Sequence, residues 1–188
     1  MKSIMMSQKS KLAILVHEGG TQTNLKIIQK AIDEGRINAE ISAVVSDRED
    51  ALPILNKTSP DYICLAGWKK IIPDEIIKKY ANRILNIHPG LIPDTLDAND
   101  SSVKNPDGSP ALWNKGMYGS KAIQNFLDQK ATFAGSSIHF LTLNFDFGPV
   151  LGRTFEKVQA SDNVESLYSR LKKKENKLYV EVLEKLIK

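Results

Sequence analysis

The sequence predicts an α/β fold of three layers, in which helices cover both faces of a mostly parallel, twisted sheet. Two observations lead to this prediction. Short apolar runs of the kind that form buried parallel strands recur along the chain, and stretches with the 3.6-residue period of an amphipathic helix lie between them. Consecutive β-α-β units of this kind build parallel sheets through right-handed crossovers.

The first half of the chain contains four predicted strands, at residues 11–16, 39–45, 62–66 and 83–87. Two helices are predicted between them. Apolar residues repeat at helical spacing over 24–32, where Thr23 or Asn24 would be the N-cap, and Pro73 opens a helix that ends at Tyr80. The second and third strands are separated by only about fifteen residues, so we expect no full crossover helix there.

The second half begins with a segment that has no periodicity. Pro, Asp, Asn, Ser and Gly predominate from Pro89 to Lys115, and a loop of this length is usually functional or mobile. The elements predicted after it are a helix at 120–128, strands at 131–142 and 149–158, and a long helix with an apolar stripe from Val164 to Leu186. Asp162-x-x-Glu165 has the spacing of a capping box for this last helix.

The composition is that of one ordinary globular domain. The chain has 188 residues, of which 41% are apolar and 26% charged, enough to bury one core without disulfides. We expect a single domain over 1–188, with residues 1–10 flexible and 94–115 as the long loop. No apolar run approaches the roughly 18 residues of a membrane span, and the first ten residues lack a signal-peptide pattern. We therefore predict a cytoplasmic protein without membrane attachment.

The composition also bears on partners. Cys64, the only cysteine, lies in an apolar run and is expected to pack as a small hydrophobe. The three histidines show no metal-ligand spacing, so no metal site is predicted. The net charge of +4 is modest, and the lysines at 172–174 fall within a helical pattern, where a solvated face is expected. We predict no nucleic-acid partner, and the mild positive field suits small anionic substrates.

Four places break the local pattern, as functional sites often do. The first is the turn at residues 17–24, which leads from a buried strand into a helix N-terminus. Such a turn presents backbone N–H groups and the positive end of the helix dipole, which suit a phosphate group. A plain connection that contains a Gly-Gly turn is the alternative.

The second place is Asn86 with His88, at the carboxyl end of a predicted parallel strand. Alternation puts both side chains on one side of the strand, at the edge where open α/β sheets bind ligands. An amide donor and an imidazole can together receive an oxygen that becomes negative during acyl transfer. The alternative is a histidine that only bonds to loop backbone.

The other two places are acidic. Asp146 lies between two phenylalanines in a tight turn, where it would either form an Asx turn or orient an imidazole and stabilise its charged form. Glu175 falls on the apolar stripe of the last helix, where a charge requires a cationic partner or a ligand amine. An irregular stripe near the middle of the helix is the alternative for Glu175.

At these residues the sequence resembles the folate-dependent formyltransferases, and most closely the phosphoribosylglycinamide formyltransferases, from about Lys11 to Tyr179. Three runs in the family's order carry the resemblance: Leu65-Ala66-Gly67-Trp68, then LNIHPGLIP from Leu85 to Pro93, then GSSIHF from Gly135 to Phe140 with DFGPV from Asp146 to Val150. The resemblance implies a formyltransferase-like fold with a Rossmann-type N-terminal half. It also implies transfer of the formyl group of 10-formyltetrahydrofolate to the primary amine of glycinamide ribonucleotide, a step of de novo purine biosynthesis.

The resemblance also implies residue roles. The catalytic residues would be Asn86, His88 and Asp146, with the oxyanion met by Asn86 and by a protonated His88 that Asp146 keeps charged. The substrate phosphate would meet the loop Gly20, Thr21, Gln22, Thr23 and Asn24, and its amine would meet Glu175. Folate would lie against Trp68, Lys69, Lys70, Ile71 and Ile72, the turn from Leu141 to Asp146, and the loop after Pro93. The family further implies a cis peptide between Ile92 and Pro93.

The sequence departs from the family pattern in three places. Gln22 replaces a glycine, the segment between the second and third strands is shorter, and the loop after Asp94 is longer, with Lys121 in place of a family histidine. Two alternatives therefore stay open: an N-formyltransferase that acts on an amino-sugar nucleotide, and a non-catalytic nucleotide- or folate-binding module. The expected partners are small molecules, and the expected state is a monomer or homodimer.

Overall fold

The computed structural model describes residues 8–96 and 103–187. Within these residues, six strands form one sheet in the order β2-β1-β3-β4-β5-β6. The strands are β1 (Ser10–Val16), β2 (Ala39–Ser46), β3 (Tyr62–Ala66), β4 (Ile84–His88), β5 (Phe133–Phe140) and β6 (Val150–Lys157). The first four are joined by parallel pairings, and β5 and β6 add to them antiparallel. The predicted mostly parallel α/β sheet is confirmed.

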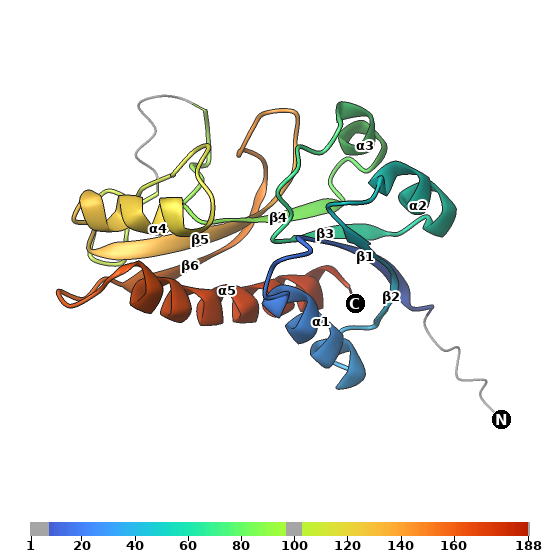
Figure 1. Cartoon of the computed structure of the whole chain (residues 1–188), viewed down its shortest axis with the longest axis horizontal. Coiled ribbons are helices and arrows are strands. Elements are labelled where there is room, and N and C mark those ends of the chain that lie inside the picture. The colour runs from blue at the N-terminus through green and yellow to red at the C-terminus, as the bar shows by residue number, and fades with distance from the viewer. Residues whose placement is uncertain (1–7, 97–102, 188) are drawn as a thin grey trace.

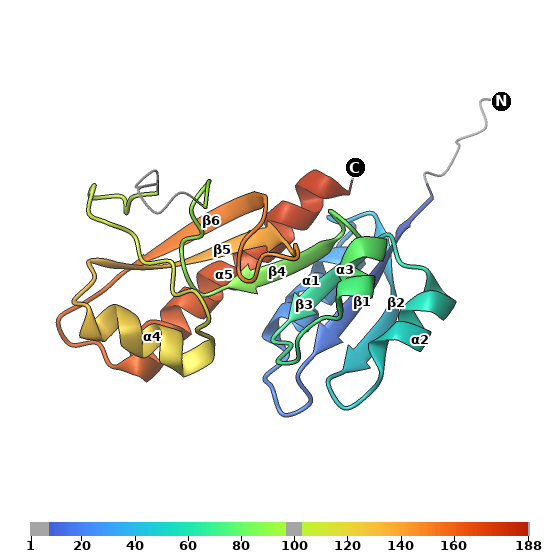
Figure 2. The same cartoon turned by 90° about the horizontal axis from the view of Figure 1, so that it is seen from above.

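In the described residues, five helices pack on this sheet. They are α1 (Thr23–Asp33), α2 (Ala51–Thr58), α3 (Asp74–Lys79), α4 (Gly119–Asp128) and α5 (Val164–Leu186). Figure 1 shows α1 and α5 below the sheet and α2 and α3 above it, so both faces are covered as predicted. Figure 2 shows the long α5 crossing beneath β4, β5 and β6. No described helix is long and apolar enough to cross a membrane.

Strand alternation divides the core between the two faces. Leu12 and Ile14 of β1 pack with residues of α1 and α5, whereas Ala13 and Leu15 pack with residues of α2 and α3. A third, smaller cluster joins α4 to α5 and β5. Burial on both faces is what makes the parallel strands read as continuous apolar runs.

The connection between β2 and β3 is a helix, contrary to our expectation. Helix α2 has only eight residues, and Pro53 is its third. A proline in the first turn lacks an N–H that would have no intrahelical partner there. Asp50 caps the helix by accepting a hydrogen bond from Leu52 N at 3.1 Å. Two short turns therefore suffice to return the chain to the sheet.

Two helix starts also differ from those predicted. Gln22, rather than Thr23 or Asn24, is the N-cap of α1, and its side chain makes no capping hydrogen bond. The capping box of α5 is formed by Asn163 with Ser166, one residue after the Asp162-x-x-Glu165 spacing. Asp162 instead forms a two-oxygen ion pair with Arg170 at 2.6 and 2.7 Å, which fastens the start of α5.

The chain between β4 and α4 contains little regular structure in its described residues. In the described residues 89–96 and 103–118, the isolated bridge between Lys104 and Pro110 is the single strand-like pairing. The peptide between Ile92 and Pro93 is trans, so the cis bond implied by the resemblance is absent. Residues 97–102 of the predicted loop, and 1–7 of the predicted flexible start, lie outside the described residues.

Candidate active site

Asn86 on β4 lies directly opposite His139 on the antiparallel strand β5. The Asn86 amide donates from Nδ2 to Nε2 of His139 at 3.2 Å. His139 in turn donates from Nδ1 to the carbonyl oxygen of Phe140 at 3.0 Å. This ring is fully buried, and burial first and the neighbouring His88 second lower its pKa to about 4. His139 is therefore neutral and serves as a fixed acceptor for Asn86.

His88, two residues further along β4, is only 2% exposed. Its Nε2 donates to the carbonyl oxygen of Trp113 at 2.7 Å, and its Nδ1 lies 3.6 Å from Oδ1 of Asp146. Burial lowers the pKa of the His88 ring below its usual value of 6.5, and the raising influences of Asp146, the Trp113 carbonyl and Glu175 offset this only in part. Desolvation is thus the larger effect on the His88 pKa, and it opposes the positive charge that Asp146 favours on this ring.

Asp146 is held by residues far from it in sequence. Its Oδ2 accepts from the backbone N–H of Gly116 at 2.7 Å, and its carbonyl oxygen accepts from the indole Nε1 of Trp113 at 2.9 Å. Its backbone has a φ of 48°, in the left-handed region. The carboxylate is therefore fixed against His88 by the segment before α4.

The predicted phosphate loop connects β1 to α1. Gln22 has a φ of 53°, the backbone conformation that a glycine adopts readily, so the residue that departs from the family pattern keeps a glycine-like turn. Asn24 is 2% exposed, and Asn24 Oδ1 and Thr23 Oγ1 are buried without a hydrogen-bond partner. His17, at the start of the loop, pairs with Asp47 after β2 at 2.5 Å and lowers the pKa of that carboxyl.

Glu175 of α5 is buried and 4% exposed, so its place on the apolar stripe is real and the irregular-stripe alternative fails. It accepts from Ser136 Oγ at 2.6 Å and pairs with Lys172 at 3.1 Å. The predicted cationic partner is Lys172. Neighbouring side chains of a strand point to opposite faces of the sheet. Ser136, which contacts Glu175, therefore points toward α5, whereas Ser137, which lies opposite His88 on β4, points to the other face. Glu175 thus lies on the other side of the sheet from Asn86 and His88.

The predicted folate-contact segments carry exposed apolar side chains. Ile71 is 84% exposed, Leu143 55% and Phe145 59%. Apolar exposure of this kind is typical of a ligand-binding surface. Lys69 is exposed as well, while Leu141 and Trp68 are half-buried.

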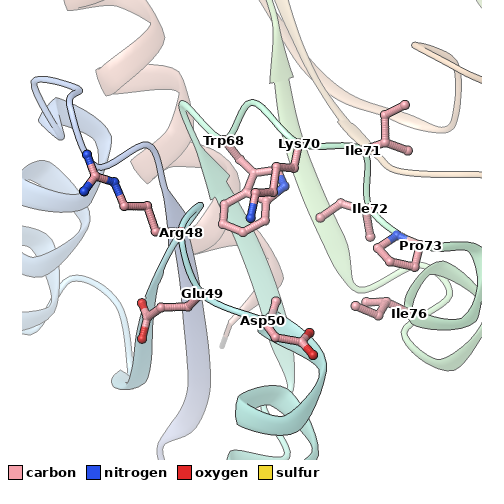
Figure 3. A pocket seen from close by; sticks show the side chains of 10 residues that line it. Arg48, Glu49, Asp50, Trp68, Lys70, Ile71, Ile72, Pro73 and Ile76 are labelled. Carbon is pink, nitrogen blue, oxygen red and sulfur yellow. The ribbon is translucent and has the colours of Figure 1, made fainter.

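Two cavities lie beside these segments. One of about 370 Å³ separates the 68–73 segment from the start of α2, and Figure 3 shows the Trp68 indole in it between Arg48 and Ile72, with Lys70 beside the ring. Another of about 200 Å³ lies between Pro93 with Asp94 and the turn at 147–150. Within the described residues, no three His, Cys, Asp or Glu side chains are grouped so as to hold a metal ion.

A family model described as formyl transferase matches residues 50–183, more than half of the chain. The chain belongs to the formyl transferase family. The matched region contains Asn86, His88, Asp146 and Glu175, and it begins after the loop at 17–25.

Individual relatives agree with this assignment. The chloroplastic phosphoribosylglycinamide formyltransferase of Arabidopsis thaliana is 28% identical over 208 residues, which cover 94% of this chain and 65% of the relative. The protein of the same name from Vigna unguiculata is 29% identical, with 95% of this chain and 61% of the relative covered. This chain therefore spans less than two thirds of the length of these plant relatives.

Solved structures show the same fold. Glycinamide ribonucleotide transformylase 1 from Symbiobacterium toebii has a TM-score of 0.74 and 25% identity, covering 95% of this chain and 88% of that one. The phosphoribosylglycinamide formyltransferase from Bacillus halodurans has a TM-score of 0.75 at 20% identity, with 94% of each chain covered.

Sequence reasoning placed Asn86, His88 and Asp146 together. In the structure His88 lies 3.6 Å from Asp146 and two residues after Asn86 on β4, and the catalytic roles of the three stay predictions. Sequence reasoning missed two residues that contact them. His139 lies in one of the quoted runs, but only the register of β5 against β4, which the sequence does not give, places it opposite Asn86. Trp113 lies in the segment without periodicity, where only its size and its indole N–H set it apart.

Proposed function

We propose that this chain transfers the formyl group of 10-formyltetrahydrofolate to the primary amine of glycinamide ribonucleotide. Membership of the formyl transferase family supports the reaction type, and the names of the relatives support the acceptor. The observation that carries the proposal is the convergence of Asn86, His88 and Asp146 at one sheet edge, with His88 Nδ1 at 3.6 Å from Asp146 Oδ1.

Asn86 would stabilise the developing oxyanion. The amine nitrogen attacks the formyl carbon, a new C–N bond forms, and the bond from that carbon to N10 of the folate breaks as N10 takes up a proton. Between these steps the carbonyl oxygen carries negative charge. One hydrogen of the Asn86 amide is engaged by His139, which leaves the second to donate to that oxygen.

His88 would take the proton that leaves the attacking amine. Its Nε2 carries a hydrogen because it donates to a carbonyl, so in the neutral ring Nδ1 holds the lone pair. Once Nδ1 is protonated, the carboxylate of Asp146 stabilises the charged ring. This assigns His88 the role of base rather than that of a charged oxyanion donor.

The substrates would be held at the two sides of this cluster. The phosphate of the ribonucleotide fits the N-terminus of α1 at Gly20 to Asn24, where backbone N–H groups and the helix dipole favour an anion. Folate fits the exposed apolar side chains of the 68–72 and 141–146 segments. The contact of Glu175 with the amine stays a prediction, and both oxygens of Glu175 already have partners within the protein. Cytoplasmic location, small-molecule partners and a monomer or homodimer stay predictions.

The test is a panel of acceptors. The purified protein is incubated with 10-formyltetrahydrofolate and, separately, with glycinamide ribonucleotide, an amino-sugar nucleotide, a simple primary amine or no amine, and release of tetrahydrofolate is followed by absorbance. We expect turnover with glycinamide ribonucleotide. Turnover with the amino-sugar nucleotide alone would contradict the acceptor. Folate binding without turnover on any amine would identify a non-catalytic binding module.

A further inference from the structure

We propose that Trp113 is a positioning residue for this reaction, which holds both members of the His88 and Asp146 pair. Its backbone carbonyl sets the protonated nitrogen of His88, and its indole N–H fixes the turn that carries Asp146. The proposal rests on the proposed function and extends it to a residue other than Asn86, His88 and Asp146.

The carbonyl contact determines the tautomer of His88. Trp113 O lies 2.7 Å from His88 Nε2, and a carbonyl oxygen can only accept, so Nε2 carries the hydrogen. A neutral imidazole has one N–H. Nδ1 therefore holds the lone pair, and it is Nδ1 that faces Asp146 at 3.6 Å. Without the carbonyl, the neutral ring could place its hydrogen on either nitrogen.

The chain is built to admit this contact. A Cβ added to Gly90 would lie 1.8 Å from Trp113 O and 2.9 Å from His88 Nε2. Glycine is therefore required beside His88 for the carbonyl to reach the ring. Leu91 N also donates to Leu112 O at 2.9 Å, which aligns the two segments at this point.

The indole contact fixes Asp146. Trp113 Nε1 donates to Asp146 O at 2.9 Å, and the ring packs edge-on against Phe147 with centroids 6.1 Å apart. Asp146 has the left-handed φ of 48°, a conformation that aspartate tolerates, and the contact from Trp113 holds this turn in place. Gly116, three residues after Trp113, supplies another contact by donating to Oδ2. One short segment thus holds the backbone and the carboxylate of Asp146.

The sharpest test replaces the indole N–H and keeps the ring. Trp113→Phe retains the backbone carbonyl and the contact with Phe147 but removes the donor to Asp146. We expect kcat with glycinamide ribonucleotide to fall about tenfold, as for the loss of one hydrogen bond in an active site. We expect KM values within about twofold of wild type and a shift in the pH at which kcat is half-maximal. If Trp113→Phe unfolds, replacement of Trp113 by benzothienylalanine, which has sulfur in place of N–H, gives the same readout.

Lys115→Met is the matched control. The Lys115 ammonium lies over the same indole at 4.8 Å from its centroid, so this variant perturbs the ring without removing its N–H. We expect its kcat and pH profile to match wild type. A wild-type kcat and pH profile in Trp113→Phe would overturn the role of the indole, and so would an equal loss in Lys115→Met.

The tautomer is tested without reference to activity. Nitrogen-15 NMR of the imidazoles at pH 7.5 distinguishes a protonated Nε2 from a protonated Nδ1. We expect the Nε2–H form for His88 in wild type and in Trp113→Phe, since the carbonyl is kept in both. An Nδ1–H form in wild type would overturn the carbonyl contact. A wild-type protein that shows Nε2–H but transfers no formyl group would contradict the proposed function and leave this contact standing.

Discussion

The Asn86 amide donates from Nδ2 to His139 Nε2 across β4 and β5 at 3.2 Å. Because His139 Nδ1 donates to Phe140 O, His139 Nε2 can only accept from Asn86. The orientation of the Asn86 amide is thereby decided, with its NH2 group turned toward the imidazole and its oxygen turned away. A donor that is fixed before substrate arrives needs no reorganisation during the reaction. Preorganisation of this donor is thus built into the register of two neighbouring strands.

Replacement of Asn86 tests this donor. We expect Asn86→Ala to lower kcat by about a hundredfold or more, since loss of one oxyanion donor costs on the order of 3 kcal/mol. Asn86→Asp keeps the volume but offers only acceptors, so we expect a loss at least as large. Steady-state kinetics with glycinamide ribonucleotide measure both, and circular dichroism confirms the fold. Full activity in Asn86→Ala would remove Asn86 from the catalytic residues.

His139 is expected to make stability depend on pH. Its folded pKa of about 4 lies below the unfolded value of 6.5, so the unfolded chain binds the proton more tightly. The contribution of His139 to the free energy of unfolding is therefore complete above pH 6.5 and is lost as the pH falls toward 4. Over that window the free energy of unfolding should decrease by about 3 kcal/mol.

His139→Gln provides the comparison, because glutamine offers an acceptor to Asn86 but does not titrate. Urea unfolding at pH 7, 5.5 and 4.5 should show a smaller decrease in the variant than in wild type. The carboxyl groups of Asp47, Glu156 and Asp162 also have lowered pKa values in the folded protein. They reduce the free energy of unfolding only as the pH falls through their unfolded pKa values, near 4. The pKa of His88 is also lowered from 6.5, so some decrease of the free energy of unfolding in acid remains in the variant. If the free energy of unfolding decreased equally with pH in wild type and in His139→Gln, the lowered pKa of His139 would be contradicted.

Much of the site followed from sequence because its signals are local. Strand periodicity places Asn86 and His88 on one side of β4, and the helical stripe places Glu175 in the core, without any knowledge of tertiary structure. The alternation of runs likewise predicted all six strands and four of the five helices found in the described part of the chain. Helix α2 was missed because the shortness of its connection was weighed more heavily than the tolerance of a first turn for proline.

The contacts of His88 could not be predicted for a different reason. Its partner is the backbone oxygen of Trp113, 25 residues away, and any residue type offers such an oxygen. Its pKa depends on the balance of burial against Asp146, and only the burial in the folded protein decides which effect is larger. His88 bonds to loop backbone and also faces Asp146, and its role in acyl transfer stays a prediction.

The pH dependence of turnover tests the role of His88. A base must be neutral to accept a proton, and the pKa of His88 is lowered from 6.5. We expect kcat to be constant above pH 6.5 and to fall only in a more acidic range, with the fall absent from the residual activity of His88→Asn. A rate that is highest in acid and declines as pH rises through 6.5 would instead identify a charged His88 as an oxyanion donor.

Replacement of Gln22 tests whether the loop at residues 20–24 binds the phosphate of the substrate. The Gln22 φ of 53° costs about 1 kcal/mol for a residue with a side chain, and glycine removes that strain while adding a comparable entropic cost in the unfolded chain. We therefore expect Gln22→Gly to change the free energy of unfolding by less than about 1 kcal/mol. Loss of the side chain lets the backbone approach an anion more closely, so KM for glycinamide ribonucleotide should fall severalfold while kcat is kept. Lys130→Gly, at an exposed position outside this loop with a similar φ of 51°, is the matched control and should leave KM unchanged. If KM for glycinamide ribonucleotide does not respond to Gln22→Gly, the phosphate of the substrate binds elsewhere.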